Sequence, residues 1–191
     1  IMIWFLFVTL TMLISHIDCT SRILPLTCDL KKEFVNGHNL HRYNVAQGLV
    51  PRQPAAANIT YLIWDEELAE KATKWAENGI FKHNPDKTVG SKRWKATGEN
   101  LYLSRYFSSR PVAVLPDIEE VLEDWFNEHQ DYEFGPFRTG YKKPIGHYTQ
   151  MIWADTSHLG CAISQKTAKD NWKEMLYVSC FLGNVYNDEP I

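Results

Sequence analysis

Two ionisable side chains in the second half of this chain could do chemistry because of where the sequence pattern places them. His147 precedes residues 148–153, a run rich in β-branched and aromatic residues that predicts a strand. An imidazole at the mouth of a strand can face a cavity and serve as a metal ligand or an acid–base group. Glu128 ends a predicted helix over residues 116–129 and lies at the edge of its apolar arc, beside Trp125.

The inward position of Glu128 has two interpretations that the residues alone leave open. A carboxylate facing the core must find a partner, because burying an unpaired charge is costly. That partner could be an ordinary salt bridge or a backbone hydrogen bond. The alternative is that Glu128 belongs to a functional site, and the ordinary partner is the favoured interpretation at this point.

The composition indicates one globular domain. The chain has 191 residues, of which 45% are hydrophobic and 23% are charged, and its formal net charge is -3. This length is enough for one sizeable core. The near-neutral charge argues against a nucleic acid as the main partner, because such proteins usually carry a basic face.

The N-terminus differs from the rest of the chain. An uncharged apolar run over residues 3–14 is too short to span a bilayer, which needs roughly 20 residues. It is typical of a secretory signal peptide, and a buried N-terminal segment is the alternative. We therefore predict a signal peptide over residues 1–20, with cleavage after Ser15 or nearer Ser21. A secreted, extracellular mature domain over residues 21–191 without a transmembrane anchor would follow.

Secretion makes the four cysteines and one sequon meaningful, because an oxidising compartment preserves disulfides. Cys161 and Cys180 lie in strand-like runs around a turn-prone cluster at 169–171. A hairpin centred there places the two cysteines opposite each other at disulfide distance. Cys19 and Cys28 would pair by elimination if cleavage retains Cys19. Asn58 begins the sequon Asn-Ile-Thr and is the predicted glycosylation site.

Periodicity predicts helices first and strands later. Apolar spacing indicates helices over residues 30–46, from Asp65 onward and over 116–129, and residues 82–98 look like a loop. Strands are expected from His147 to the end. This order indicates an α+β domain in which helices cover an antiparallel sheet.

An aromatic loop precedes the histidine run. Tyr132, Phe134 and Phe137 lie within six residues that also contain Gly135 and Pro136. The rings either clamp the loop onto the core or form an apolar binding surface, and the local sequence does not choose between these alternatives.

The motifs of the whole chain resemble those of the CAP superfamily, which comprises sperm-coating, venom-allergen and pathogenesis-related proteins. The similarity covers nearly all of the expected mature chain and depends on the order of several short motifs. They are Phe34-Val35-Asn36-Gly37-His38-Asn39, Leu62-Ile63-Trp64-Asp65, His83-Asn84, Gly98-Glu99-Asn100-Leu101, Trp125-Phe126-Asn127-Glu128, the run from Gly146 to Trp153, and Gly160-Cys161. The chain departs from the family at Gly79, where a cysteine is often found.

The resemblance implies a three-layer α-β-α sandwich with a central antiparallel sheet. It also implies a cleft lined by His83, Glu99, Glu128 and His147. In such a tetrad the two imidazoles could hold zinc or another divalent cation weakly, with the carboxylates orienting the rings. Two protein ligands are fewer than catalytic zinc usually has, and the sequence lacks a zinc-protease or nucleophile-elbow motif. A binding protein is therefore expected, with a metal-dependent hydrolase as the less favoured reading.

Family resemblance further implicates the aromatic loop in sterol binding and two helices in holding a fatty acid. The first hypothesis is thus a secreted lipid-binding protein whose sterol loop contains Tyr132, Phe134 and Phe137. The alternative from another functional class is a secreted effector or allergen that binds a host or other extracellular protein.

Overall fold

A computed structural model describes residues 21–88, 94–107, 115–135, 140–167 and 172–185, with only the backbone described for most of the last segment. The helices and strands follow in chain order as β1 (Arg22–Leu24), α1 (Cys28–Ala46), β2 (Ile63–Trp64), α2 (Glu66–Ala76), β3 (Trp94–Gly98), β4 (Leu101–Phe107), α3 (Ile118–Asn127), a 3-10 turn η1 (Glu128–Gln130), α4 (Gly146–Met151), β5 (His158–Thr167) and β6 (Trp172–Val185). The predicted signal peptide lies outside these residues. Within them, no helix is both long and apolar enough to cross a membrane.

The sheet is built around the hairpin of β5 and β6. Its path runs β1-β5-β6-β3, while β2 pairs with β5 and β4 pairs with β6. β2 lies parallel to β5, so the sheet is mixed, whereas the other pairs are antiparallel as predicted. The prediction of a loop over residues 82–98 was wrong for its last residues, because these form β3 and pair with β6. The polar residues and glycines of this segment do not predict a strand, because the strand forms through pairing with a segment far away in the sequence.

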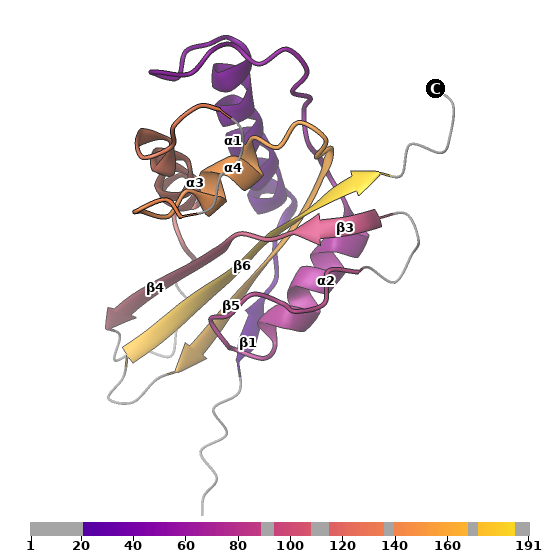
Figure 1. Ribbon diagram of the computed structural model, residues 1–191. Coiled ribbons are helices and arrows are strands. Elements are labelled where there is room, and N and C mark those ends of the chain that lie inside the picture. The colour runs from indigo at the N-terminus through magenta and orange to yellow at the C-terminus, as the bar shows by residue number, and fades with distance from the viewer. Residues whose placement is uncertain (1–20, 89–93, 108–114, 136–139, 168–171, 186–191) are drawn as a thin grey trace, which may run out of the picture.

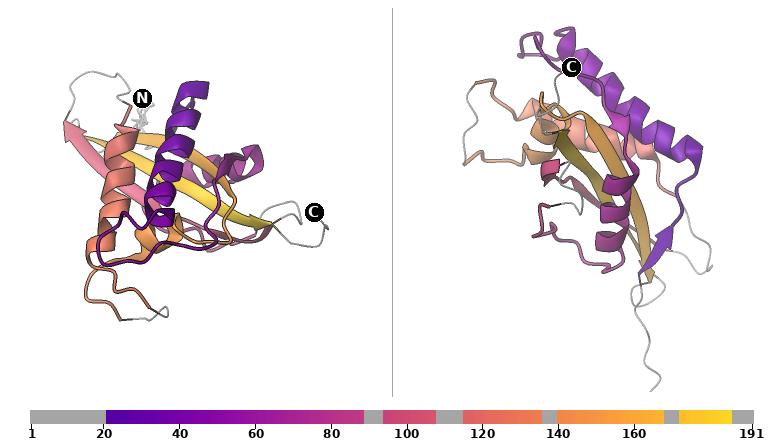
Figure 2. Two further views of the ribbon diagram at one scale, coloured as in Figure 1. Left: turned by 90° about the horizontal axis from the view of Figure 1, so that it is seen from above. Right: turned by 90° about the vertical axis from the view of Figure 1, so that its right-hand side faces the viewer.

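The three-layer sandwich is visible in Figures 1 and 2, with α2 on one face of the sheet and α1, α3 and α4 on the other. Alternate residues of β5 confirm this division. Leu159, Cys161 and Ile163 join the core under α1, α3 and α4. Ala162 joins the smaller core under α2, and Gly160 lies directly against the backbone of α2. Helices therefore cover both faces of the strand hairpin.

Side-chain caps fix where the helices begin. The Thr27 hydroxyl accepts from the amide of Leu30 at 3.2 Å and starts α1. The Asp65 carboxylate accepts from the Leu68 amide at 2.9 Å and starts α2, which confirms the predicted start of this helix. Asp117 caps α3 in the same way.

The segment that contains His147 is a helix, so the predicted strand at residues 148–153 was wrong. Residues 146–151 form α4, and the strand begins only at His158. The Glu128 carboxylate accepts from the amides of His147 and Tyr148 and so satisfies the free N–H groups of the first turn. This tertiary contact outweighs the weak β preference of the local residues.

The cysteines follow only part of the prediction. Cys161 is disulfide-bonded. The β5–β6 register pairs Gly160 with Phe181 and then shifts before Ala162, which brings the backbone of Cys180 to the level of Cys161. The side chain of Cys180 is outside the described part, so this pairing stays a prediction. Cys28 opens α1 with an exposed free thiol; Cys19 is outside the described residues, so the Cys19–Cys28 pairing stays a prediction.

Candidate functional site

His147 and Glu128 form the first of two histidine–carboxylate pairs. Oε1 of Glu128 lies 2.8 Å from Nδ1 of His147, while Oε2 accepts from the His147 amide at 2.8 Å and the Tyr148 amide at 3.2 Å. The Glu128 side chain is 11% exposed and that of His147 is 31% exposed. The indole of Trp125 stacks on the imidazole, with ring centroids 5.9 Å apart. Glu128 thus fixes both the helix start and the ring orientation.

His83 and Glu99 form the second pair. Glu99 lies in the turn between β3 and β4, and its side chain is fully buried. Its Oε2 lies 2.9 Å from Nδ1 of His83 and accepts from the Asn84 amide at 2.8 Å. Lys87 adds an ammonium group 3.8 Å from the same oxygen. The His83 side chain is 58% exposed, so this imidazole is the more accessible of the two.

Residues next to the pairs connect them. Asn100, which follows Glu99, donates from Nδ2 to the carbonyl of His147 at 3.2 Å. The Gln150 side chain lies over Gly98, where an added Cβ would be 2.0 Å from its Oε1. The β3–β4 turn and α4 therefore lie against each other, and all four residues of the predicted tetrad are found in the same region of the fold.

The hydrogen bonding of the two imidazoles suits a weak metal site. Each Nδ1 faces a carboxylate, an arrangement in which Nδ1 carries the proton and the Nε2 lone pair is left for a metal. Oε1 of Glu99 is buried without a hydrogen-bond partner, so this carboxylate keeps an unused acceptor. Within the described part of the chain, no group of three or more His, Cys, Asp or Glu residues could hold a metal ion. At most two imidazole nitrogens, one from each pair, could therefore take part in a metal site here.

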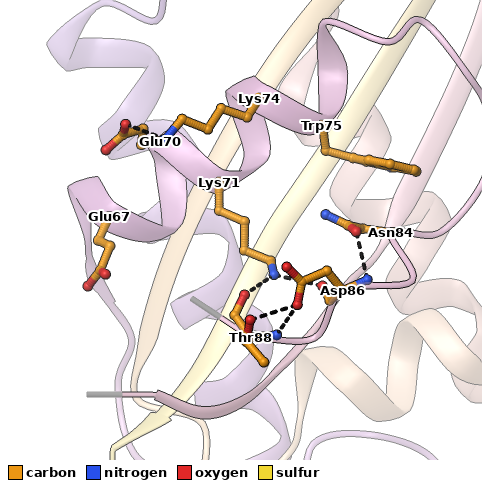
Figure 3. A pocket seen from close by; sticks show the side chains of 8 residues that line it. All are labelled: Glu67, Glu70, Lys71, Lys74, Trp75, Asn84, Asp86 and Thr88. Carbon is orange, nitrogen blue, oxygen red and sulfur yellow. Dashed lines mark hydrogen bonds and ion pairs between the residues drawn. The ribbon is translucent and has the colours of Figure 1, made fainter. Parts of the chain in front are cut away.

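A polar pocket of about 360 Å³, which sequence reasoning missed, lies between α2 and the loop after His83 (Figure 3). Lys71 extends across it and donates to the carbonyls of Asp86 and Thr88. Burial is the main cause that lowers the Lys71 pKa. The lysine cross-links helix and loop, so the simplest role of this pocket is to hold in place the loop that carries His83. Only the three-dimensional proximity of α2 and the loop reveals it.

The aromatic loop is partly clamped and partly free. The Tyr132 ring packs 5.5 Å from that of Tyr148 and stacks 6.2 Å from that of Tyr141. Burial raises the Tyr132 pKa. Phe134 is 61% exposed, and Phe137 lies outside the described residues. Tyr132 therefore clamps the loop onto neighbouring rings, while the ring of Phe134 is accessible to solvent.

Two other predicted features have clear surroundings. Asn58 is exposed in the loop before β2, where a glycan would meet no steric barrier. A groove of about 530 Å³ lies between α1 and α3, the two helices considered for a fatty acid. His41 is buried on the inner face of α1, and acidic side chains from both helices border this groove.

Comparison with known proteins identifies the family. The model of the CAP, or cysteine-rich secretory protein, family matches residues 35–181. Scoloptoxin SSD976 of Scolopendra dehaani is 32% identical over 181 residues, covering 93% of this chain and 80% of the relative. Venom allergen 5 of Polistes fuscatus is 37% identical over 181 residues, covering 89% and 82%.

Solved structures agree. Venom allergen-like protein 4 of Schistosoma mansoni is 26% identical, covers 86% of this chain and 97% of its own, and superposes with a TM-score of 0.57. BmVAL-1 is also 26% identical, covers 85% and 80%, and gives a TM-score of 0.64. The motif order, the α-β-α layers and these matches lead to one conclusion: the chain belongs to the cysteine-rich secretory protein (CAP) family.

Proposed function

We propose that this protein is a secreted, non-catalytic lipid-binding protein that takes a sterol at the aromatic loop. The supporting observation is the contrast between two neighbouring rings. Tyr132 is held by the rings of Tyr141 and Tyr148, while Phe134 stays 61% exposed on the same loop. A large apolar ring on a fixed support is suited to contact a flat apolar ligand.

The apolar contact that Phe134 alone can offer supports only weak binding. A buried aromatic side chain and its ligand together remove on the order of 100–200 Å² of apolar surface from water, which at about 25 cal/mol per Å² gives roughly 2.5–5 kcal/mol. Part of this is lost to immobilising the ligand. Micromolar binding would therefore need additional apolar contact, for which Phe137 is the proposed partner of Phe134.

The test is saturable binding of radiolabelled cholesterol to the purified, secreted protein. Replacing Phe134 and Phe137 together by Ala should weaken binding at least tenfold. The matched control is Phe107→Ala, because Phe107 is 62% exposed at the end of β4 and away from the loop. Absence of saturable binding, or equal loss in the control, would reject the loop as the sterol site.

The names of the relatives are consistent with secretion. They include venom allergens of Dolichovespula maculata and salivary antigen-5 of Dipetalogaster maximus, so related chains occur in venom or saliva. A partner protein is the second candidate function, because a protein found in venom or saliva meets the proteins of another organism. Capture of a defined receptor that is unaffected by Phe134→Ala and by added sterol would support that alternative.

We further propose that the tetrad binds a divalent cation through Nε2 of His83 and His147. The bound ion would supply positive charge, and the two carboxylates would hold the rings in the required tautomer. Zinc titration by calorimetry should show binding that the His83→Ala/His147→Ala double variant loses. His158→Gln is the control, since His158 pairs with Ser157 outside the tetrad. Equal zinc binding by the double variant would remove the site.

A further inference from the structure

The groove between α1 and α3 has an apolar floor. The two helices lie side by side in Figure 2. Ile118 and Leu122 of α3 are almost fully buried beneath the groove, and Leu40 of α1 is 58% exposed along it. Gly37 lets α1 and α3 approach closely at this floor, because an added Cβ would lie 2.3 Å from the Leu122 side chain. The volume of about 530 Å³ is within the range of small-molecule sites.

The charges that border this floor are all of one sign. Glu33 comes from α1, while Glu119 and Glu123 come from α3. Asp117, which caps the start of α3, also lines the groove. Among the described residues that line the groove there is no lysine or arginine. Carboxylates from two facing helices repel each other, and a cation placed between them relieves that repulsion.

His41 supplies an independent sign of an unfilled polar position. It lines the groove, is 5% exposed, and its Nδ1 has no hydrogen-bond partner. Its Nε2 lies 3.7 Å from Oε1 of Glu123, so the ring and this carboxylate meet across the two helices. Burial lowers the His41 pKa to about 4, so the ring is neutral near pH 7 and leaves the acidic border uncompensated.

We infer that this groove binds a cationic amphiphile: a protonated amine attached to an aliphatic or aromatic body. The ammonium group would lie among Glu33, Glu119 and Glu123, and the body would lie on Leu40 and Leu122. The same charges oppose the binding of a fatty acid. Its carboxylate would have to approach these three glutamate carboxylates, and the described residues that line the groove include no lysine or arginine to pair with it. The inference concerns a different site from the sterol loop and does not depend on it.

Three probes that share a ten-carbon alkyl tail but differ in head-group charge separate the effect of charge from that of apolar contact. Decylammonium, decanol and decanoate are titrated into the full chain by calorimetry at pH 7.4 and low salt. We expect decylammonium to bind tightest, at least tenfold tighter than decanoate, and its affinity to fall as salt screens the carboxylates. Decanoate binding as tightly as decylammonium, or no binding of decylammonium, would overturn the inference.

Neighbouring glutamates on one helix provide matched variants. Glu119→Gln with Glu123→Gln should weaken decylammonium roughly three- to tenfold, the range expected for two exposed ion pairs, and should leave decanol unchanged. Glu120→Gln removes one charge from α3, against two in the double variant, without touching the groove, and should change affinity less than twofold. Equal weakening by Glu120→Gln would mean that only net charge matters and would overturn the inference. Phe134→Ala should leave amine binding intact, which separates this result from the sterol test.

Discussion

Replacing Glu128 by Ala should destabilise the protein through α4 rather than through lost packing. The carboxylate is 11% exposed and accepts three hydrogen bonds, from the His147 and Tyr148 amides and from His147 Nδ1. Hydrogen bonds to a charged acceptor contribute roughly 1.5–3 kcal/mol each, and the amides left behind lose their only acceptor unless water reaches them. His147 is 31% exposed, so water replaces part of the loss. We expect about 3 kcal/mol less stability.

Glu128→Gln separates the two functions of this side chain. Its amide oxygen can still accept from both backbone amides, so the expected loss is only about 1 kcal/mol. Its NH2 group, however, would face His147 Nδ1 and favour the tautomer with the proton on Nε2, which removes the lone pair proposed to bind zinc. This variant should therefore keep its fold and lose roughly 10- to 100-fold in zinc affinity.

Urea unfolding followed by tryptophan fluorescence measures the stability, and hydrogen exchange of the His147 and Tyr148 amides measures the local effect. A loss of about 3 kcal/mol corresponds to a fall in Tm of roughly 6–12 °C for a domain of this size. Glu120→Ala, on the exposed face of α3, should stay within about 0.5 kcal/mol of the parent chain. If Glu128→Ala behaves like Glu120→Ala, or if Glu128→Gln is as unstable as Glu128→Ala, the hydrogen bonds of Glu128 do not hold the start of α4.

Three further outcomes follow from buried groups. Arg42 is 1% exposed and donates to four backbone carbonyls, so Arg42→Met should cost about 4 kcal/mol in urea unfolding; a loss below 1 kcal/mol would contradict this. Gly160→Ala would place a Cβ 2.1 Å from the Ala69 amide and should cost at least about 3 kcal/mol, whereas Gly146→Ala meets nothing within 4 Å and should change Tm by less than about 2 °C. Burial lowers the His38 pKa from 6.5 to about 4, so stability present above pH 6.5 is lost as the pH falls toward 4. His38→Gln should remove about 2–3 kcal/mol of that pH dependence between pH 7 and 4.5, and an unchanged slope would show that His38 does not cause it.

Sequence patterns predicted those elements whose signals are local. The first helix was expected over residues 30–46 and is observed as Cys28–Ala46, because caps and apolar periodicity act within a few residues. The β5–β6 hairpin was also placed correctly, with Ala162 opposite Val178 around the predicted turn. The sequence did not predict β3 or α4. β3 depends on pairing with a distant strand, and α4 depends on a carboxylate 19 residues away along the chain.

The sequence by itself determined the family and the α+β class and singled out His83, Glu99, Glu128 and His147 as candidates, because ordered motifs and helical periodicity are properties of the chain. Only the tertiary structure decided how these four pair. It put Glu128 at the start of α4, tied Glu99 to His83 and Asn84, and aligned carboxylates from α1 and α3 along one groove. Such relations depend on distances between segments far apart in sequence, which hydrogen bonding and packing set only when the whole chain has folded.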